Sequence, residues 1–411
     1  MKDQDQFDIA VVGAGAVGLA AALTFQREGY RTCLIGPASP VQDGRTVALF
    51  QGSVSFLAAI GLWSRLLPHA TPLETMRIID DTDNLFHVPA IDFRASEIGL
   101  DAFGWNVTNV TLQETLSEAV SSHSDIIHIP EFVTQFSTSD PGRAVITTKD
   151  GRRISASLVV AADGRRSVLR HMAGIQAETW DYPQSAVTTI LRHERSHENA
   201  STEFHTRTGP FTLVPLEGPR SSVVWLTQPE KAAQLVRMSD ADLASAIEKQ
   251  ARYMLGRMTV DGPRAAVPMS GLSVDRYTGS RIALVGETAH VFPPLGAQGL
   301  NLGLRDVADL RDVVVEAADG TVGSRESLQR YNRSRKKDVM GRTCSVGGLN
   351  RMLLSPYLPV DWIRASGLAT VASINPLRKI VMRMGMRPLL GTPQLMQGAI
   401  SIEGTLVDAN A

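Results

Sequence analysis

Three apolar runs dominate the pattern of this chain. Each is followed by a turn containing glycine and then by residues that suit a helix. The runs cover residues 7–12, 158–162 and 282–285. A buried strand is a short continuous apolar run, whereas an amphipathic helix repeats its apolar residues every three or four positions. The pattern therefore predicts an α/β protein in which three strand–turn–helix units lie far apart in the sequence.

A glycine turn separates the first predicted strand from the first predicted helix. Gly13, Gly15 and Gly18 follow the apolar run, a helical pattern covers residues 19–28, and a second strand is predicted at 32–35. Within a βαβ unit this spacing is typical of dinucleotide binding. The first glycine makes the tight turn, the second lets a pyrophosphate approach the backbone, and the third allows the helix to pack on the strand. The sequence therefore predicts a Rossmann-like dinucleotide site.

The second predicted strand lacks one element of such a site. An acidic residue usually follows this strand and binds the adenosine ribose. Here the position is Gly36, and Pro37 follows it. We therefore expect the ribose to be bound by backbone groups, by water or by another side chain.

The last of the three units has the most informative turn. Residues 286–301 contain two adjacent prolines and then two glycines, and a helical pattern begins near Gly299. Proline fixes φ, and glycine permits close approach of the backbone. The start of the helix presents free N–H groups and the positive end of a helix dipole, which together stabilise an anion. A flavin, whose N1–O2 edge becomes anionic on reduction, is one group that would suit this turn.

The middle unit ends its strand with Asp163-Gly164. Ser167 and Arg170 follow on a short helix. An Asp-Gly pair after a strand is commonly only a turn. Arginines follow this Asp-Gly pair at the start of the helix, so the turn is also suited to holding phosphates.

In their order and separation the three motifs resemble those of the single-component FAD-dependent aromatic hydroxylases, the para-hydroxybenzoate hydroxylase superfamily. Residues 43–63 and 208–225 further resemble segments of its ubiquinone-biosynthesis hydroxylase group. The resemblance covers most of residues 5–385. One departure is Glu287, which stands where the family usually has the aspartate that contacts the ribityl chain. Glutamate keeps the carboxylate and sets it one methylene farther from the backbone.

The resemblance implies cofactor contacts from all three turns and from two positions outside them. The residues expected to bind FAD are Gly13, Ala14, Gly15, Gly18, Arg45, Asn109, Asp163, Glu287, Gly296, Gln298, Gly299, Leu300 and Asn301. Arg45 is either a contact to pyrophosphate or nicotinamide or a surface arginine, and Asp163 either binds the FAD ribose or shapes its turn. For catalysis, Pro294 is expected on the substrate side of the flavin, and His290 is either a proton relay or structural. No side chain stands out as a general base, and no metal site is expected.

The motifs and the segments between them predict interleaved domains. A Rossmann-like FAD-binding domain is expected at 1–72, 98–178 and 271–350, a mixed-sheet substrate domain at 73–97 and 179–270, and a helical C-terminal region at 351–411. Alternating apolar residues at 186–191 and 211–216 predict strands that lie over the flavin. Residues 239–256 are predicted to be helical, with Ser239 as the N-cap.

Composition agrees with a soluble enzyme that has a large core. Of the 411 residues, 43% are hydrophobic and 20% charged, and the net charge of −1 gives no reason to expect a nucleic-acid partner. Cys33 and Cys344 have no metal or redox spacing. No signal sequence precedes Asp8 and no run is long enough for a membrane span, so we expect a cytoplasmic protein.

The predicted helix at 375–386 is basic and amphipathic, and it has two interpretations. Such a helix can lie on an anionic membrane or on a lipid-bearing partner. It can equally pack its apolar side on its own domain and leave its charges in water. The first interpretation would make the protein peripheral on the cytoplasmic membrane face or part of a quinone-biosynthesis complex.

The function that the resemblance implies is that of an FAD-dependent monooxygenase. The flavin would be reduced by NAD(P)H or another electron donor, react with O₂, and pass one oxygen atom as a hydroperoxide to an electron-rich aromatic ring. The expected substrate is a polyprenylated precursor in ubiquinone biosynthesis. Two alternatives stay open: a flavin monooxygenase of the same fold acting on a soluble phenol or secondary metabolite, and a non-catalytic binder of a prenylated partner. Bound FAD in the purified protein would separate the enzymes from the binder.

Overall fold

Five parallel strands form the centre of the first sheet, in the order β19-β11-β1-β2-β8. The computed structural model describes residues 5–37, 44–82, 89–139, 142–292, 298–317, 321–354, 374–386, 391–404 and 406–407. The strands of this sheet are β1 (Gln6–Val12), β2 (Thr32–Ile35), β8 (Ile126–Ile129), β9 (Val133–Ser137), β10 (Ala144–Thr148), β11 (Arg153–Ala161), β18 (Thr278–Gly279) and β19 (Ile282–Leu284). The central strands are nearly continuous apolar runs because both faces of a parallel sheet are covered.

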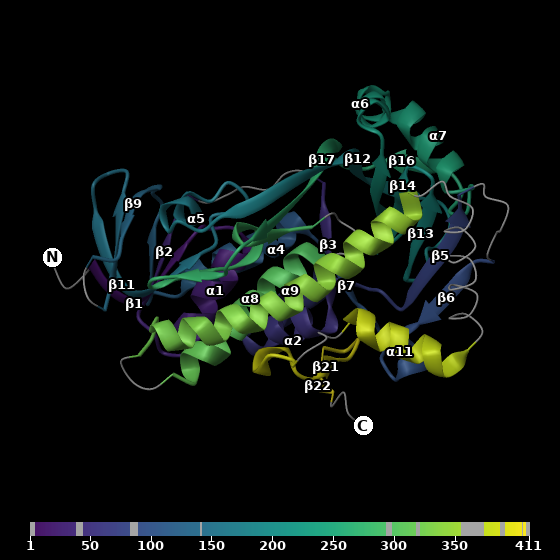
Figure 1. Ribbon diagram of the computed structural model, residues 1–411. Coiled ribbons are helices and arrows are strands. Elements are labelled where there is room, and N and C mark those ends of the chain that lie inside the picture. Colours follow the sequence, from purple (N-terminus) through teal and green to yellow (C-terminus); the bar gives the residue numbers. More distant parts are fainter. Residues whose placement is uncertain are drawn as a thin grey trace.

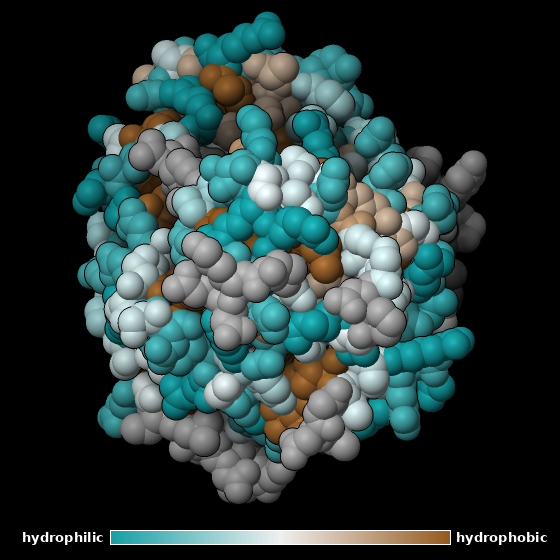
Figure 2. All heavy atoms as spheres, turned by 90° about the vertical axis from the view of Figure 1, so that its left-hand side faces the viewer, coloured by the Kyte–Doolittle hydropathy of each residue, from teal (hydrophilic) through white to brown (hydrophobic). Residues whose placement is uncertain are grey.

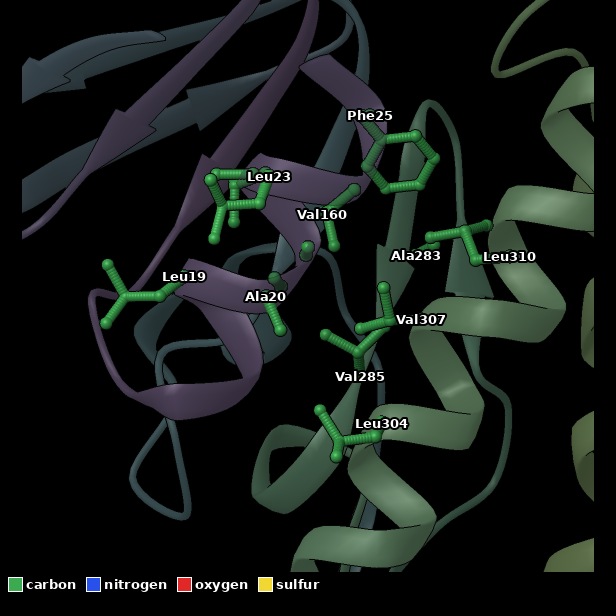
Figure 3. Close-up of a cluster of buried hydrophobic side chains, with 14 of the residues drawn as sticks. Leu19, Ala20, Leu23, Phe25, Val160, Ala283, Val285, Leu304, Val307 and Leu310 are labelled. Carbon is green, nitrogen blue, oxygen red and sulfur yellow. The ribbon is translucent and has the colours of Figure 1, made fainter. Parts of the chain in front are cut away.

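Helices α1 (Ala16–Arg27) and α8 (Gln298–Val315) pack against each other and on this sheet, and α4 (Asn109–Ser122) packs beside α1. Figure 3 shows side chains of α1 and α8 converging with Val160 of β11 and Ala283 of β19. Most of these side chains are fully buried. Because burying a leucine, valine or phenylalanine contributes roughly 1.5–3 kcal/mol, this cluster fixes the positions at which α1 and α8 begin.

The second sheet is mixed, with the order β20-β17-β12-β15-β14-β13-β5-β6 and with β16 beside β12. All its pairings are antiparallel except that of β13 with β5. Its strands are β5 (Thr75–Asp81), β6 (Ile91–Arg94), β12 (Ala177–His193), β13 (Ala200–Thr206), β14 (Gly209–Leu216), β15 (Arg220–Thr227), β16 (Met258–Val260), β17 (Ala265–Val274) and β20 (His290–Val291). The strands predicted at 186–191 and 211–216 are therefore confirmed.

The two faces of the second sheet have different neighbours. Alternate residues such as Val187, Phe204 and Trp225 form a core with the helices α6 (Pro229–Arg237) and α7 (Asp240–Gln250). The residues between them in the sequence point to the opposite face. On that face Ser222 of β15 shares a 2.7 Å hydrogen bond with Thr46. We call it the inner face, because this contact joins it to the part of the chain that carries the first sheet.

A small third sheet lies between the two large ones and consists of β3 (Thr46–Phe50), β7 (Gly104–Thr108) and β4 (Thr71–Pro72). Short helices lie between its strands in the sequence: α2 (Gln51–Ala59), α3 (Trp63–Leu66) and η2 (Leu67–His69) between β3 and β4, and η3 (Ala95–Ile98) between β6 and β7. Asn106 of β7 donates a 2.8 Å hydrogen bond to the carbonyl of Pro215 on β14. The third sheet therefore connects the first sheet to the inner face of the second.

The remaining elements come mostly from the C-terminal part of the chain. They are α5 (Val168–Met172), η4 (Gly286–Thr288), α9 (Arg325–Leu354), α11 (Asn375–Met386), η6 (Gln394–Met396), β21 (Ala399–Ile400) and β22 (Leu406–Val407). Figure 1 shows α9 running from the first sheet towards the second, where it packs against β14, while α11 lies beside β6. On α11, Met382 is buried against apolar side chains of β5 and β6.

The helix predicted at 239–256 is confirmed at its start and is wrong at its end. Ser239 is the N-cap, and its hydroxyl accepts a 3.2 Å hydrogen bond from the backbone of Asp242. The helix ends at Gln250 because Arg252 and Tyr253 adopt left-handed conformations, with φ of 50° and 55°. Non-glycine residues seldom adopt this conformation, so the break could not be predicted from local sequence.

The molecular surface seen in Figure 2, at the end that carries β9, is mostly hydrophilic, and the apolar residues drawn in colour form only small separate patches. Among the residues that the structure describes, no helix is both long enough and apolar enough to cross a bilayer.

Candidate cofactor and active site

The three glycines between β1 and α1 have different surroundings. A Cβ atom on Gly13 would lie 2.2 Å from the carbonyl oxygen of Ala162, and one on Gly18 would lie 1.8 Å from that of Gly13. These two positions therefore need glycine for packing. A Cβ atom on Gly15 would meet no atom of the described residues within 4 Å. Gly15 thus borders open space in which a bound group can approach the backbone.

Gly15 is also the N-cap of α1, and no side chain caps this helix. Its first N–H groups and the positive end of its dipole are therefore available to an anion. The turn is held from behind, because Gln113 of α4 donates a 2.8 Å hydrogen bond to the carbonyl of Ala14. This arrangement fits the pyrophosphate of a dinucleotide.

Asp163 lies at the end of β11, and both of its carboxylate oxygens accept hydrogen bonds from its own turn. Oδ1 accepts from the hydroxyl of Ser167 at 2.6 Å, and Oδ2 accepts from the backbone N–H of Leu169 at 3.1 Å. Thr288 of η4 also lies beside it, with its hydroxyl 3.4 Å from Oδ1. The structure thus gives Asp163 a turn-forming role, while its direct contact with a cofactor ribose stays a prediction.

Thr288 connects the middle turn to the last one. Its hydroxyl accepts a 3.0 Å hydrogen bond from the backbone of Gly164, and its carbonyl accepts one from Arg170 at 2.8 Å. The neighbouring Glu287 is exposed on η4. The turn after β11 and the turn after β19, more than a hundred residues apart in the sequence, are therefore in contact. Glu287, whose carboxylate is expected at the ribityl chain, lies next to this contact.

Asp306 of α8 holds the same turn from inside the protein. Its Oδ2 accepts a 2.7 Å hydrogen bond from the backbone of Gly286 and lies 2.7 Å from Nε2 of His290. Arg335 of α9 lies 2.7 Å from Oδ1. Burial acts to raise the pKa of Asp306, but His290 and Arg335 outweigh it, so the pKa lies below its ordinary value.

His290 is therefore part of a buried ionic cluster. The cluster continues from Arg335 to Asp309 at 2.7 Å and to Asp338 at 2.9 Å. Burial raises the pKa of Asp309, despite this contact with Arg335. The surroundings favour a structural role for His290 over a proton relay, because its Nε2 is committed to the aspartate.

At the start of α8, a Cβ atom on Gly299 would meet no described atom within 4 Å. Leu300 packs against the main core. Gly296 and Pro294 lie outside the described residues, and so does the side chain of Gln298.

The side chain of Asn301 points into the protein. Its Oδ1 accepts from the backbone of Phe50 at 3.0 Å and from the hydroxyl of Ser53 at 2.7 Å, and its Nδ2 donates to the carbonyl of Ala48 at 2.8 Å. Asn301 thus fastens α8 to β3 and α2. Any contact of Asn301 with the cofactor would have to come from its backbone.

Arg45 and Asn109 are brought together at one end of the third sheet. The backbone N–H of Asn109 donates a 3.0 Å hydrogen bond to the carbonyl of Arg45. Arg45 is exposed and Asn109 is half-buried. The structure thus places them as neighbours, and their expected contacts with the cofactor phosphates stay predictions.

Sequence reasoning did not predict three contacts: that of the Asn301 side chain with β3 and α2, that of Asp306 with the last turn, and that of Gln113 with the first turn. The partners in these contacts lie 16 to 253 residues away in the sequence. For Asp306, the available signal was an acidic residue on the apolar side of α8, four positions from Leu302 and four from Leu310. Such a residue is rarely buried without a charged partner.

The helix starts at Gly15 and Gly299 and the glycine turn between β1 and α1 fit a flavin dinucleotide, and comparison with known proteins agrees. The profile of the FAD binding domain family matches residues 6–344. This chain belongs to that family, and it is an FAD-dependent monooxygenase with the para-hydroxybenzoate hydroxylase fold.

The chain is 30% identical to ubiquinone hydroxylase UbiL of Rhodospirillum rubrum, over 95% of this chain and 92% of that protein. It is 32% identical to 3-demethoxyubiquinol 3-hydroxylase of Escherichia coli, over 80% of this chain and 86% of that protein. Among solved structures it is similar to Klebsiella pneumoniae HpxO complexed with FAD and uric acid. That match has a TM-score of 0.75 and 16% identity, over 95% of this chain and 99% of the other. At this identity the solved structure supports the fold alone.

Proposed function

We propose that this monooxygenase hydroxylates the aromatic ring of a polyprenylated precursor in ubiquinone biosynthesis. The observation that carries the proposal is the similarity, at 30% and 32% identity over most of the chain, to two proteins named for hydroxylating the ubiquinone ring system. The proposal for the electron donor is NAD(P)H, and O₂ is the proposed source of the oxygen atom.

The protein would contribute binding, orientation and electrostatics. When bound, FAD supplies the redox chemistry and oxygen activation that no side chain of this chain can provide. The first turn of α1 would hold the pyrophosphate beside Gly15, and the first turn of α8 would stabilise negative charge on the flavin ring beside Gly299. Asp306 and Asn301 would keep these backbone groups in place.

One part of the inner face of the second sheet suits an apolar substrate. Ala186, Leu226 and Met269 are buried in one apolar cluster there, and Val224 and Val267 pack against it. A prenyl chain gains about 0.8 kcal/mol for each CH₂ that it buries. A surface of this kind would therefore bind a prenylated ring more strongly than the bare ring.

Complementation tests the proposal. The chain would be expressed in an Escherichia coli strain that lacks 3-demethoxyubiquinol 3-hydroxylase, and quinones would be profiled by mass spectrometry. We expect ubiquinone to return, whereas the Gly15→Val variant should not restore it. In the source organism, deletion should accumulate a prenylated precursor short of one or more ring hydroxyls. Normal ubiquinone in that strain, with no redundant hydroxylase present, would refute the assignment.

The purified enzyme offers a direct measurement. It should consume O₂ and NAD(P)H faster with a prenylated phenol than with para-hydroxybenzoate. Faster turnover of para-hydroxybenzoate would favour a soluble phenol as the substrate. A protein that binds the prenylated phenol but never oxidises NAD(P)H would be a binder without redox chemistry.

We further propose that α11 contacts the surface of an anionic membrane. Ile380 of α11 is 52% exposed, and Lys379 and Arg383 are exposed beside it. The opposite side of α11 is fixed, because Arg378 forms an ion pair with Glu97 at 2.6 Å. An exposed isoleucine beside exposed cations suits an interface with anionic lipid.

Vesicle flotation tests this contact. The protein should float with vesicles that contain phosphatidylglycerol and should not float with pure phosphatidylcholine. Ile380→Asp should remove the binding, while Glu326→Gln, at the exposed first turn of α9, should leave it unchanged. Equal flotation of wild type and Ile380→Asp would show that α11 is not the contact.

A further inference from the structure

One buried histidine of the second sheet is not accounted for by the cofactor site. His205 of β13 has a side chain that is 6% exposed, and its Nε2 lies 2.8 Å from Oε1 of Glu203. Its Nδ1 is buried and has no hydrogen-bond partner among the residues that the structure describes. Leaving a buried polar atom without a partner destabilises the fold, so this nitrogen needs an explanation.

The side chain of His205 points to the inner face of the sheet. Phe204 belongs to the core under α6 and α7, and successive residues of a strand point to opposite faces. Glu203 and His205 therefore share the inner face. On the neighbouring strand β5, Asp80 is the register partner of His205, so its carboxylate projects from the same face.

The position of His205 on this face can be read from the strand register. Glu203 pairs with Thr212, which in turn pairs with Val224, and Ser222 lies two residues before Val224. Ser222 is thus displaced from Glu203 by two residues in one direction along the strands, and His205 is displaced from Glu203 by two residues in the other direction. His205 is therefore about 13 Å along the strands from the contact between Ser222 and Thr46, at roughly 3.4 Å per residue.

The hydrogen bond to Glu203 fixes which nitrogen of the ring is free. An ionised carboxylate only accepts hydrogen bonds, so Nε2 carries the proton that it shares with Glu203. In the neutral ring Nδ1 then has a lone pair and accepts. A carboxylate behind an imidazole also stabilises the cation that forms when the other nitrogen takes up a proton.

The surroundings contain two acids and no described cation in contact with the ring. Glu203 lies on the same strand and Asp80 on β5, while the register partner on β14 is Pro210. The nearby Arg207 is directed elsewhere and donates to the carbonyl of Thr82 at 2.6 Å. Among the residues that the structure describes, no group of three or more His, Cys, Asp or Glu residues is suited to a metal.

We infer that the Glu203–His205 pair binds a ring hydroxyl of the aromatic substrate and accepts its proton at Nδ1. The O–H bond of the phenol breaks, an N–H bond forms at Nδ1, and the electron pair stays on the phenolate oxygen, so nothing is oxidised or reduced in this step. A phenolate is more electron-rich than a phenol and is the better acceptor of an electrophilic oxygen. The inference rests on the proposed aromatic substrate and assigns a catalytic residue to it.

Ligand binding to the FAD-loaded enzyme tests the inference without turnover. The probes are 4-nitrophenol, whose phenolate has a distinct visible spectrum, and 4-nitroanisole, which has no proton to give. We expect the wild type to bind the phenol at least about 10-fold more tightly than the anisole, a difference of about 1.4 kcal/mol, and to show the phenolate spectrum. His205→Gln and Glu203→Gln should reduce this preference to about 3-fold or less.

His193→Gln is the matched control. His193 is a buried histidine of the same sheet, but it points away from the inner face, and both of its ring nitrogens have protein partners. This variant should keep the preference of the wild type for the phenol. Equal preference in the wild type and in His205→Gln, or an equal loss in His193→Gln, would overturn the inference.

Turnover separates this inference from the proposed function. With a prenylated phenol, kcat of His205→Gln should fall about 10²- to 10⁴-fold, the range for loss of a general base, while FAD content stays unchanged. If the wild type hydroxylates the phenol and His205→Gln does so equally well, only the role of His205 fails. If the wild type hydroxylates no phenol, the proposed function fails, and the binding preference still decides whether His205 accepts a proton.

Discussion

Nε2 of His290 lies 2.7 Å from Oδ2 of Asp306, and both side chains are buried. The same carboxylate oxygen accepts the backbone N–H of Gly286. Because one aspartate holds both ends of the turn that contains Glu287, the geometry of this turn depends on a charge inside α8.

We expect Asp306→Asn to lower the free energy of unfolding by about 3–5 kcal/mol, the usual cost of removing one partner of a buried ion pair. Arg335 would keep its charge without its central partner. Urea unfolding followed by circular dichroism measures this loss. Glu118→Gln is the control, because it breaks only the exposed pair with Arg65 and should cost less than about 1 kcal/mol. A loss for Asp306→Asn as small as that of the control would show that the cluster does not stabilise the fold.

Acid should weaken the fold through the same residue. The pKa of Asp306 lies below its ordinary value in the folded protein, so its contribution is present above about pH 4 and is lost as the pH falls through the folded pKa. Each additional proton bound by the unfolded chain lowers stability by about 1.4 kcal/mol per pH unit. Urea unfolding between pH 3 and pH 7 should therefore give a shallower slope for Asp306→Asn than for wild type. Identical slopes would contradict the assignment.

Gly15→Val should abolish FAD binding while the apoprotein stays folded. The backbone of Gly15 has an ordinary extended conformation, with φ of −79° and ψ of 174°, and its Cβ atom would enter open space. The side chain would therefore occupy the approach of the pyrophosphate without straining the chain. Flavin absorbance and thermal unfolding of the purified protein measure the two effects.

Gly18→Ala is the matched comparison for Gly15→Val. Its Cβ atom would lie 1.8 Å from the carbonyl oxygen of Gly13, so this smaller substitution should destabilise the fold itself. A Gly15→Val variant that purifies with its full complement of flavin would show that the glycine turn is not the FAD site.

Gly299→Pro should lower the reduction potential of the bound flavin. The substitution removes one N–H donor from the first turn of α8, where negative charge on the reduced flavin would be stabilised. Stability should change less than the potential does, because proline is tolerated in the first turn of a helix. Spectroelectrochemical titration measures the potential, and Gly299→Ala, which keeps the N–H group, is the control. An unchanged potential with normal FAD content would rule out this role.

The parts of the site that could be predicted from the sequence are the motifs whose residues lie close together in the chain. Gly13, Gly15 and Gly18 lie within six positions, and the strand and helix around them follow from local periodicity, so their separate roles could be inferred. Ser239 as an N-cap is equally local. The FAD-dependent monooxygenase class was predicted correctly because three such local motifs occur in a fixed order.

The parts that were not predictable depend on contacts between distant segments. Asn301 matches a cofactor motif, but its side chain is used by Phe50 and Ser53, which only the packing of α8 on α2 brings near. The sequence around Asp163 is compatible both with a contact to a ribose and with hydrogen bonds to its own turn, so the two roles cannot be distinguished from sequence. His205 lies in an unremarkable strand, and its significance comes from the face to which the pleat directs it.

The hydrogen bond between Thr46 of β3 and Ser222 of β15 joins the third sheet to the second, and the strands of all three sheets alternate along the chain. Between β3 and β7 of the third sheet the chain forms β5 and β6 of the second sheet, and β12 of the second sheet lies between β11 and β19 of the first. Neither large sheet therefore corresponds to a continuous stretch that could be expressed by itself. Many native contacts join residues distant in sequence, which slows folding. The two large sheets should melt as one cooperative unit, so a truncation designed to isolate the flavin half would yield an unfolded chain rather than a smaller flavoprotein.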